Sequence, residues 1–251
     1  MSIQLLKLQE VQDKKLAEEK ALRIYKNFKE AISEVERDLV EMGIRVSPKT
    51  YQDKNVEYDV GFETLELQNY IYTVLNPVRK GIGENQPYCD VEFKERVAGI
   101  EGTPKNPGEA WKTRPDIWRE FLSDITGKFA YTYAERYARN DQVNKIIERL
   151  TDDPESRQLY VSMWDIYDTS LLGGISRVPC SLGYLFQVRK GALNMTYLMR
   201  SCDFVTHFRN DIYLSACLQE HIANTGGFEI GTFTHWMGSL HIFKRDAQGV
   251  F

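Results

Sequence analysis

Residues 199–211 have the sequence MRSCDFVTHFRND, which combines phosphate-binding chemistry with the predicted start of a helix. Arg200 and Ser201 place a guanidinium beside a hydroxyl, a pair suited to binding a phosphate monoester. Taken singly, such an arginine is more often part of a surface ion pair. Asp203 and Asp211 follow, and two acids near a helix start usually cap the helix and stay solvated.

Apolar segments lie on both sides of this stretch. From residue 159 onward the segments LYVSMWDIY, YLFQV and ALNMTYLMR predict strands, with a turn at 189–191. Residues 210–224 predict a helix opened by an Asn-Asp pair, and FEIGTFTHWMGSLHIF follows a Gly-Gly pair as a last apolar segment. Because strands and helices are interspersed, we expect a mixed α+β fold.

The N-terminal part is predicted to be helical and then irregular. Residues 3–41 carry apolar side chains mostly three or four apart, which predicts one long amphipathic helix or two. Irregular heptads favour packing on its own domain over a partner-binding coiled coil. Strands are expected within 56–75, a loop over 99–116 and partial helix over 118–139. We expect a single catalytic domain spanning 1–251, with this helical segment at its start.

Composition narrows the classes of function. The 251 residues carry a formal net charge of −4, so a general nucleic-acid surface is not expected. No apolar run is long enough to span a bilayer, and the start lacks the features of a secretory signal. We therefore expect a cytoplasmic protein (host cytoplasm if viral) without a membrane or nucleic-acid partner. The cysteines lack CxxC or metal-ligand spacing, so reduced thiols and no metal are expected. They are Cys89, Cys180, Cys202 and Cys217.

Cys180, in RVPCSLGY, is the candidate nucleophile. A lone cysteine beside a proline is more often an inert packed residue. A reactive cysteine needs a positive neighbourhood because the thiolate is the nucleophile, and Arg200 and Arg157 are candidates to supply it or to bind phosphate. His241, in SLHIF, lies on an apolar alternating segment, where a histidine is more often structural than catalytic.

Four motifs, by their order and spacing, resemble the thymidylate synthase family: PC at 179–180, RSCD at 200–203, RND at 209–211 and GSLHIF at 238–243. The resemblance covers about residues 153–243. Within the family, MRSCDFVTHFRND and GSLHIF look most like bacteriophage deoxycytidylate (dCMP) 5-hydroxymethylases. The resemblance implies a thymidylate synthase-like fold, with a mixed bent β-sheet flanked by helices and one sheet face at a homodimer interface.

The resemblance also implies a reaction. In this family a cysteine thiolate adds to C6 of a pyrimidine nucleotide, and C5 then takes a one-carbon unit from the co-substrate 5,10-methylenetetrahydrofolate. Hydride gives a methyl product and water gives a hydroxymethyl product. By resemblance Cys180 is the nucleophile, which divides one difficult step into two easier ones. Nucleotide and folate are the expected small-molecule partners, and no metal is implied.

The resemblance assigns phosphate-binding residues. Arg200 and Ser201 match the family's Arg-Ser pair. Arg157 matches an arginine that reaches across a dimer interface to the partner's nucleotide. Lys49, in SPKT, falls where relatives carry a basic residue in a phosphate loop.

The resemblance also assigns the residues that contact the folate and the catalytic glutamate. Asp203 matches an aspartate that contacts the pterin, and Trp118, in DIWREF, matches a tryptophan lining the folate pocket. Tyr133 resembles the tyrosine of a YG motif. Glu92, in YCDVEFKERV, is the best match for the catalytic glutamate, and Glu95 is its competitor.

Asp211 is predicted to select the base. Thymidylate synthases carry asparagine here, whose amide suits N3–H and O4 of uracil. Cytosine offers an N4 amino donor and an N3 acceptor, so a carboxylate can accept from N4–H while a shared proton serves N3. Matching a base edge in this way discriminates by about 1–3 kcal/mol. The resemblance therefore favours recognition of a cytosine base, and not helix capping, as the role of Asp211.

The sequence departs from the family in four places. His241 is expected to bind substrate, but Phe243 stands where relatives have a tyrosine that contacts the sugar, which leaves CMP open beside dCMP. Gln158 and Ala134 replace a second arginine and the glycine of the YG motif. The sequence ends eleven residues after Leu240, where relatives continue into a tail over the folate, and a more open pocket would favour water as the final reactant.

Three interpretations follow. The first is a dCMP 5-hydroxymethylase, a folate-dependent transferase acting in a nucleotide pool for modified phage DNA. The second is a dCMP C5-methylase or a thymidylate synthase. The third is a catalytically weak relative that binds a nucleotide or a partner protein, suggested by Phe243, Gln158 and the short tail.

Overall fold

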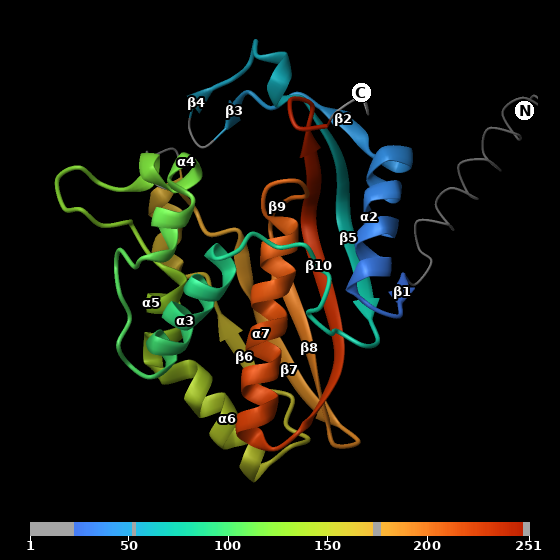
Figure 1. Ribbon diagram of the computed structural model, residues 1–251, viewed down its shortest axis with the longest axis vertical. Coiled ribbons are helices and arrows are strands. Elements are labelled where there is room, and N and C mark those ends of the chain that lie inside the picture. The colour runs from blue at the N-terminus through green and yellow to red at the C-terminus, as the bar shows by residue number, and fades with distance from the viewer. Residues whose placement is uncertain (1–22, 52–53, 173–176, 248–251) are drawn as a thin grey trace, which may run out of the picture.

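The structure is a computed structural model in which residues 23–51, 54–172 and 177–247 are described (Figure 1). The first part of the predicted N-terminal helix, residues 1–22, lies outside these ranges. Within the described ranges, every helix is too short or too polar to cross a bilayer.

A mixed sheet of eight strands forms the centre of the fold. Its strands are β1 (Ile24–Tyr25), β2 (Ile44–Val46), β5 (Thr64–Val74), β6 (Tyr160–Ser162), β7 (Ser181–Arg189), β8 (Ala192–Met199), β9 (Cys202–Asp203) and β10 (Glu229–Phe243). The main order is β1-β5-β10-β8-β7-β6, with β2 beside β5 and β9 beside β10. Strand β1 is parallel to β5, and β10 is parallel to β8 and β9, whereas the other pairs are antiparallel. A separate small ribbon pairs β3 (Thr50–Tyr51) with β4 (Lys54–Asn55).

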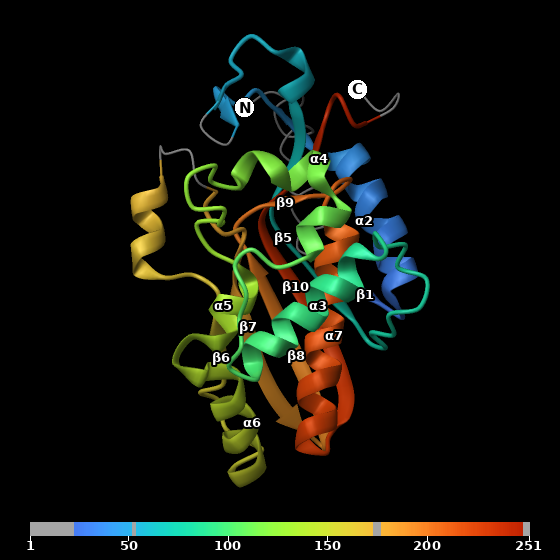
Figure 2. The same cartoon turned by 60° about the vertical axis from the view of Figure 1, so that its left-hand side comes forward.

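Helices flank this sheet (Figures 1 and 2). They are α2 (Phe28–Met42), α3 (Tyr88–Ile100), α4 (Pro115–Trp118), α5 (Tyr133–Ala138), α6 (Gln142–Asp152) and α7 (Phe208–Gly226). Helix α2 packs on β5 and α7 packs on β8 and β10, while α3 and α6 pack on α7. The expected α+β class, with a mixed sheet and flanking helices, is confirmed.

Aromatic side chains fix α7 on the sheet. Phe208, in the first turn of α7, is fully buried and stacks with His235 of β10 at 5.9 Å between ring centroids. His235 in turn stacks on Tyr197 of β8 at 4.9 Å, and Tyr197 on Tyr184 of β7 at 4.6 Å. Burial lowers the pKa of His235 to about 3, so the ring is neutral and packs as an aromatic group. This layer determines where the first turn of α7 stands, and with it Asp211.

The β7–β8 hairpin closes through a two-residue turn, as predicted for 189–191. Lys190 and Gly191 have φ values of 55° and 79°, the left-handed pair that matches strand twist in tight hairpins. At the other end of the hairpin the register shifts between Ser181 and Gly183. A Cβ at Gly183 would lie 2.4 Å from the backbone carbonyl oxygen of Val161, so glycine is required there. The irregularity lies directly after Cys180.

The predicted helix over 3–41 is wrong in part. Ile24 and Tyr25 form a strand that pairs with β5, and the helix begins only at Phe28. The side chain of Asn27 accepts a hydrogen bond from the Glu30 amide at 3.0 Å, which caps the helix at that point.

The predicted capping of the helix over 210–224 is also wrong. Helix α7 begins two residues earlier, at Phe208, so Asn210 and Asp211 lie inside its first turn. Asn210 accepts a hydrogen bond from the Asn85 amide at 2.8 Å, and Asp211 lines a cavity. The Asn210 side chain is therefore used in a tertiary contact, and Asp211 is available to the cavity.

The strand predicted from LYVSMWDIY is confirmed only at Tyr160–Ser162. Asp165 begins a 3₁₀ helix, Ile166–Leu171, through a reciprocal pair of side-chain hydrogen bonds with Asp168. The local capping signal ends the extended segment.

Candidate active site

A cavity of about 480 Å³ opens between β9, β10, α3, α5 and α7. Nine of the eleven residues predicted for the site line it. They are Glu92, Trp118, Tyr133, Cys180, Arg200, Ser201, Asp203, Asp211 and His241. These residues are spread over 150 positions of sequence, from Glu92 to His241, so the fold brings them together.

Cys180 lies immediately before β7 and is only partly buried. All four cysteines are free, and the other three are buried. Burial raises the pKa of Cys89, Cys202 and Cys217, which keeps those thiols protonated and inert. Cys180 and Cys202 both line the cavity, and of the four cysteines Cys180 alone is partly exposed.

The backbone before Cys180 is held from two sides. The carbonyl oxygen of Pro179 accepts hydrogen bonds from Trp164 Nε1 and from Arg200 Nε, each at 2.9 Å. Arg200 Nη2 also donates to the Val178 carbonyl at 2.9 Å and lies 3.8 Å from the Cys180 sulfur. Arg200 therefore holds the backbone of the loop and places its guanidinium beside the thiol of Cys180, the candidate nucleophile.

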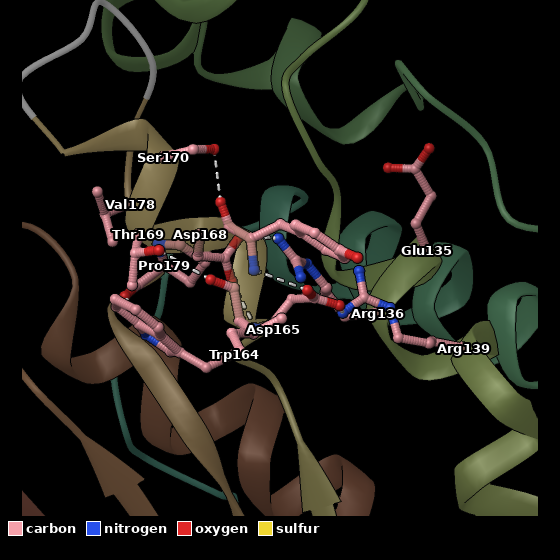
Figure 3. A network of polar contacts seen from close by, with 12 residues as sticks. Glu135, Arg136, Arg139, Trp164, Asp165, Asp168, Thr169, Ser170, Val178 and Pro179 are labelled. Carbon is pink, nitrogen blue, oxygen red and sulfur yellow. Dashed lines mark hydrogen bonds and ion pairs between the residues drawn. The ribbon is translucent and has the colours of Figure 1, made fainter.

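A buried ion pair joins α5 to the 3₁₀ helix Ile166–Leu171, close to this loop. Figure 3 shows Arg136 of α5 beside Asp168 of the 3₁₀ helix, an ion pair in which both side chains are about 95% buried. Asp165 pairs with Arg139, and the Asp165 amide donates to Asp168 at 2.7 Å. Helix α5 begins at Tyr133, whose hydroxyl accepts a hydrogen bond from the Ser181 amide at 3.3 Å. This contact connects α5 with the residue that follows Cys180, the candidate nucleophile.

Asp211 is a carboxyl that titrates near neutral pH. Burial raises its pKa to about 7, and the guanidinium groups of Arg96 and Arg177 only partly oppose that effect. Asp211 therefore exists in both protonation states at physiological pH. A carboxyl in this condition can donate or accept a hydrogen bond, depending on the group it meets.

Glu92 and Glu95 both line the cavity but have different partners. Glu92 forms an ion pair with the buried Arg96 at 2.9 Å. Glu95 accepts hydrogen bonds from the amides of Glu109 and Ala110, the second at 3.3 Å. Burial raises the pKa of Glu95, as is typical of a general acid or base.

Asp203 and Trp118 lie on the wall of the same cavity. One carboxylate oxygen of Asp203 accepts from the amides of Val205 and Thr206, both at 3.0 Å, which orients the side chain. The ring of Trp118 stacks against Tyr88, with 6.2 Å between centroids. This wall offers a flat apolar face beside a fixed carboxylate, which fits a planar heterocycle such as a pterin.

His241 and Phe243 lie at the end of β10. Burial lowers the pKa of His241, so its imidazole is neutral at pH 7, and its Nδ1 lies 3.3 Å from the Ser239 hydroxyl. The ring of Phe243 meets Tyr51 at 5.3 Å and Phe62 at 5.9 Å in edge-on contacts. This end of the cavity is thus aromatic.

Lys49 and Arg157 are not brought into the cavity. The Lys49 side chain is 80% exposed and forms an ion pair with Glu57 at 3.5 Å, while its neighbours Pro48 and Thr50 line the cavity. Arg157 is exposed between α6 and β6. Their roles in phosphate binding stay predictions.

Sequence reasoning missed three side chains that line the cavity: Arg96, Arg177 and His207. Arg96 follows Glu95 on α3, and its guanidinium covers the Tyr133 ring at 4.7 Å. Arg177 precedes Cys180 by three positions, and His207 precedes α7. The sequence signal that could have found Arg177 and His207 was their closeness to the Cys180 and Asp203 motifs. Within the described ranges, no group of His, Cys, Asp or Glu side chains is arranged to hold a metal ion.

A half-buried cysteine beside a guanidinium, with titrating carboxyls in one cavity, is typical of enzymes that use a cysteine nucleophile on a small anionic substrate. A family profile described as thymidylate synthase matches residues 107–250. The chain belongs to the thymidylate synthase family. Members of this family use methylenetetrahydrofolate, bind a nucleotide and are typically dimers.

Similar proteins carry the same family name. The chain is 30% identical over 213 residues to a Methanothermobacter marburgensis protein named "putative thymidylate synthase", covering 82% of this chain and 91% of that protein. Proteins of the same name from Methanosarcina barkeri and Methanosarcina acetivorans are 32% and 33% identical over 166 and 167 residues. Each of those alignments covers 62% of this chain and 75% of the relative.

Proposed function

We propose that this chain acts as one catalytic domain that transfers a one-carbon unit from 5,10-methylenetetrahydrofolate to C5 of a cytosine nucleotide. The proposed substrate is dCMP and the proposed product is 5-hydroxymethyl-dCMP, as in the bacteriophage hydroxymethylases. The observation that carries the proposal is Asp211, a carboxyl with a pKa of about 7 that faces the cavity holding Cys180.

Asp211 fits cytosine for a stated chemical reason. In its protonated form the carboxyl accepts from the N4 amino group with one oxygen and donates its proton to N3, which is an acceptor in cytosine; in its ionised form it still accepts from N4. Whenever Asp211 is ionised, uracil would place its O4 lone pairs against a carboxylate that has no proton to donate, whereas cytosine still donates to it from N4. A mismatch of this kind, which leaves a buried polar group unpaired, costs about 1–3 kcal/mol.

Cys180 and Arg200 begin the proposed reaction. The Cys180 thiolate, whose sulfur lies 3.8 Å from the Arg200 guanidinium, adds to C6 of the pyrimidine and makes C5 nucleophilic. The folate supplies the one-carbon unit that C5 receives. Proton removal from C5 and elimination of tetrahydrofolate leave an exocyclic methylene, and water adds there before the Cys180 thiolate leaves C6.

A glutamate is needed to hold water and move protons near the base. Glu92 was the better match by sequence, but its carboxylate is held by Arg96. We propose Glu95 for this role because it pairs with no guanidinium among the described residues and burial raises its pKa. A carboxyl with a raised pKa exchanges protons more readily near neutral pH.

The nucleotide and the folate are proposed to bind at different ends of the cavity. Arg200 and Ser201 are proposed to bind the phosphate, and Trp118 and Asp203 the pterin. His241 and Tyr133 complete the proposed substrate contacts. In a proposed homodimer, Arg157 of the partner subunit reaches the phosphate, and Lys49 adds a further positive charge there. Light scattering that shows a monomer at micromolar concentration would contradict the dimer.

The test is a product assay. The protein is incubated with methylenetetrahydrofolate and, in parallel, dCMP, CMP or dUMP, and nucleotide products are identified by mass spectrometry beside a Cys180→Ala variant. A gain of CH2O on dCMP that the variant lacks is expected. A gain of CH2 would identify a methylase, and conversion of CMP would assign a ribonucleotide. Turnover of dUMP alone would identify a thymidylate synthase, and no product would leave a nucleotide-binding relative.

A further inference from the structure

Arg177 is a cavity-lining arginine whose contacts, among the described residues, are with aromatic rings. It lies three residues before Cys180, and its guanidinium carbon lies 4.5 Å from the centre of the Trp118 ring and 5.0 Å from that of Phe121. Within the part of the chain that the structure describes, no carboxylate or carbonyl forms an ion pair or hydrogen bond with it. Its charge therefore faces aromatic rings and the cavity.

The other two arginines that line the cavity are different. Arg96 is paired with Glu92 at 2.9 Å, and Arg200 donates to the carbonyl groups of Pro179 and Val178. A guanidinium withdrawn from water is costly unless its donors are satisfied, and contact with a ring face compensates only in part. Arg177 thus retains unused hydrogen-bonding capacity directed at a ligand.

The surroundings of Arg177 indicate which ligand. The ring of His207 lies 6.1 Å from that of Trp118, and burial, followed by the charge of Arg177, lowers the pKa of His207 to about 4. This wall of the cavity therefore carries a neutral imidazole, a broad aromatic face and one positive charge. It suits a flat ring that has hydrogen-bond acceptors on its edge, because guanidinium groups bind such edges with two parallel donors.

We propose that Arg177 determines specificity for the one-carbon donor, by donating hydrogen bonds to the oxo group on the edge of its pterin ring while Trp118 and Phe121 contact the ring face. The proposal rests on the proposed function, since it takes the donor to be a tetrahydropterin. Arg200 and Asp211 are left to the nucleotide.

The test compares two substitutions with a matched control. Arg177→Met keeps the length and apolar contacts of the side chain but removes charge and donors. Arg177→Lys keeps the charge but loses the planar pair of donors. Arg149→Met is the control, because Arg149 is about half exposed on α6 and pairs only with Asp153 among the described residues. Thermal unfolding of each variant confirms that it is folded.

Binding is measured for each ligand separately. Tetrahydrofolate, the unreactive product form of the donor, is titrated by tryptophan fluorescence with dCMP present, and dCMP is titrated alone by calorimetry. Arg177→Met is expected to weaken tetrahydrofolate binding by about tenfold or more, since a hydrogen bond to a charged group is lost. Arg177→Lys is expected to lie between, with dCMP affinity within about twofold of wild type in every variant.

Each outcome decides. Unchanged tetrahydrofolate affinity in Arg177→Met would overturn the proposal, as would weakened dCMP binding alone, which would place the guanidinium in the nucleotide site. A wild-type protein that does not bind tetrahydrofolate would overturn it as well. If the wild type forms product but Arg177→Met binds tetrahydrofolate normally, this inference fails and the proposed function stands. If the wild type forms no product but Arg177→Met loses tetrahydrofolate binding, the proposed function fails and this inference stands.

Discussion

Replacing Asp211 with asparagine is expected to stabilise the protein at alkaline pH and to leave its stability at pH 4 nearly unchanged. The pKa of Asp211 is raised from 3.8 to about 7 because the carboxyl is buried. A raised carboxyl pKa means that the folded state prefers the protonated form. The contribution of this group to stability is complete below pH 3.8 and is lost as the pH rises through 7.

The size of the effect follows from the same values. At about 1.4 kcal/mol per pH unit, a pKa of about 7 in place of 3.8 costs the folded protein roughly 4 kcal/mol above pH 8. This is an upper value, because Asp211 borders a cavity that admits water. Asparagine has no charge to bury, so Asp211→Asn avoids the whole cost.

The assay is urea-induced unfolding of wild type and variant at pH 4, 6, 7 and 8.5, with protein concentration held constant. The difference in the free energy of unfolding is expected to be near zero at pH 4 and to grow to a few kcal/mol at pH 8.5. Measuring both proteins at each pH removes the contribution of the other titrating groups. A difference that is the same at every pH would refute the argument that burial of this carboxyl controls its ionisation.

The same variant tests the choice of base. An amide accepts from N3–H and donates to O4 of uracil, so Asp211→Asn is expected to raise turnover of dUMP relative to dCMP. With about 1–3 kcal/mol from one bidentate pair, the ratio of the two kcat/KM values should shift by about tenfold or more. A ratio that does not move would show that Asp211 does not contact the base.

Three further substitutions test the supporting structure. Cys180→Ser is expected to abolish product formation, and to leave dCMP binding, measured by calorimetry, within a fewfold of wild type. Arg136→Met leaves Asp168 buried without its partner and is expected to cost about 3–5 kcal/mol in urea unfolding; an unchanged midpoint would contradict the buried pair. Gly183→Ala places a Cβ 2.4 Å from the Val161 carbonyl oxygen and against the Tyr160 side chain and is expected to cost about 1–3 kcal/mol; an unchanged midpoint in urea unfolding would contradict this close approach.

The strand-rich second half of the fold was predictable because its signals are local. Strands β7 and β8 alternate buried and more exposed residues, and the Lys190–Gly191 turn joins them in the expected place. The position of Asp211 was predictable from its motif. Its protonation behaviour was not, because burial of that carboxyl depends on α3 and α7 meeting in space.

The errors arise where tertiary contacts compete with local preference. Asn210 is a good capping residue, but its side chain is occupied by the Asn85 amide, and α7 begins before it. The choice of Glu92 over Glu95 stays a prediction, and what separates the two in the structure is Arg96, which pairs with Glu92 one helical turn away. Arg177 lies two residues before the PC motif of the family, and its contacts with Trp118 and Phe121, which led to the proposal for it, depend on packing that the sequence does not show.

The shared acceptor at Pro179 has a consequence for how variants of this protein are interpreted. Because Trp164 and Arg200 donate to the same carbonyl oxygen, Arg200 acts at once as a proposed anion ligand and as a brace for the peptide before the nucleophile. A kinetic defect in an Arg200 variant therefore mixes two causes. Trp164→Phe removes one donor from that carbonyl while leaving the Arg200 guanidinium in place. Comparing the kinetic defects of the two variants would separate lost alignment of the Cys180 sulfur from lost affinity for phosphate.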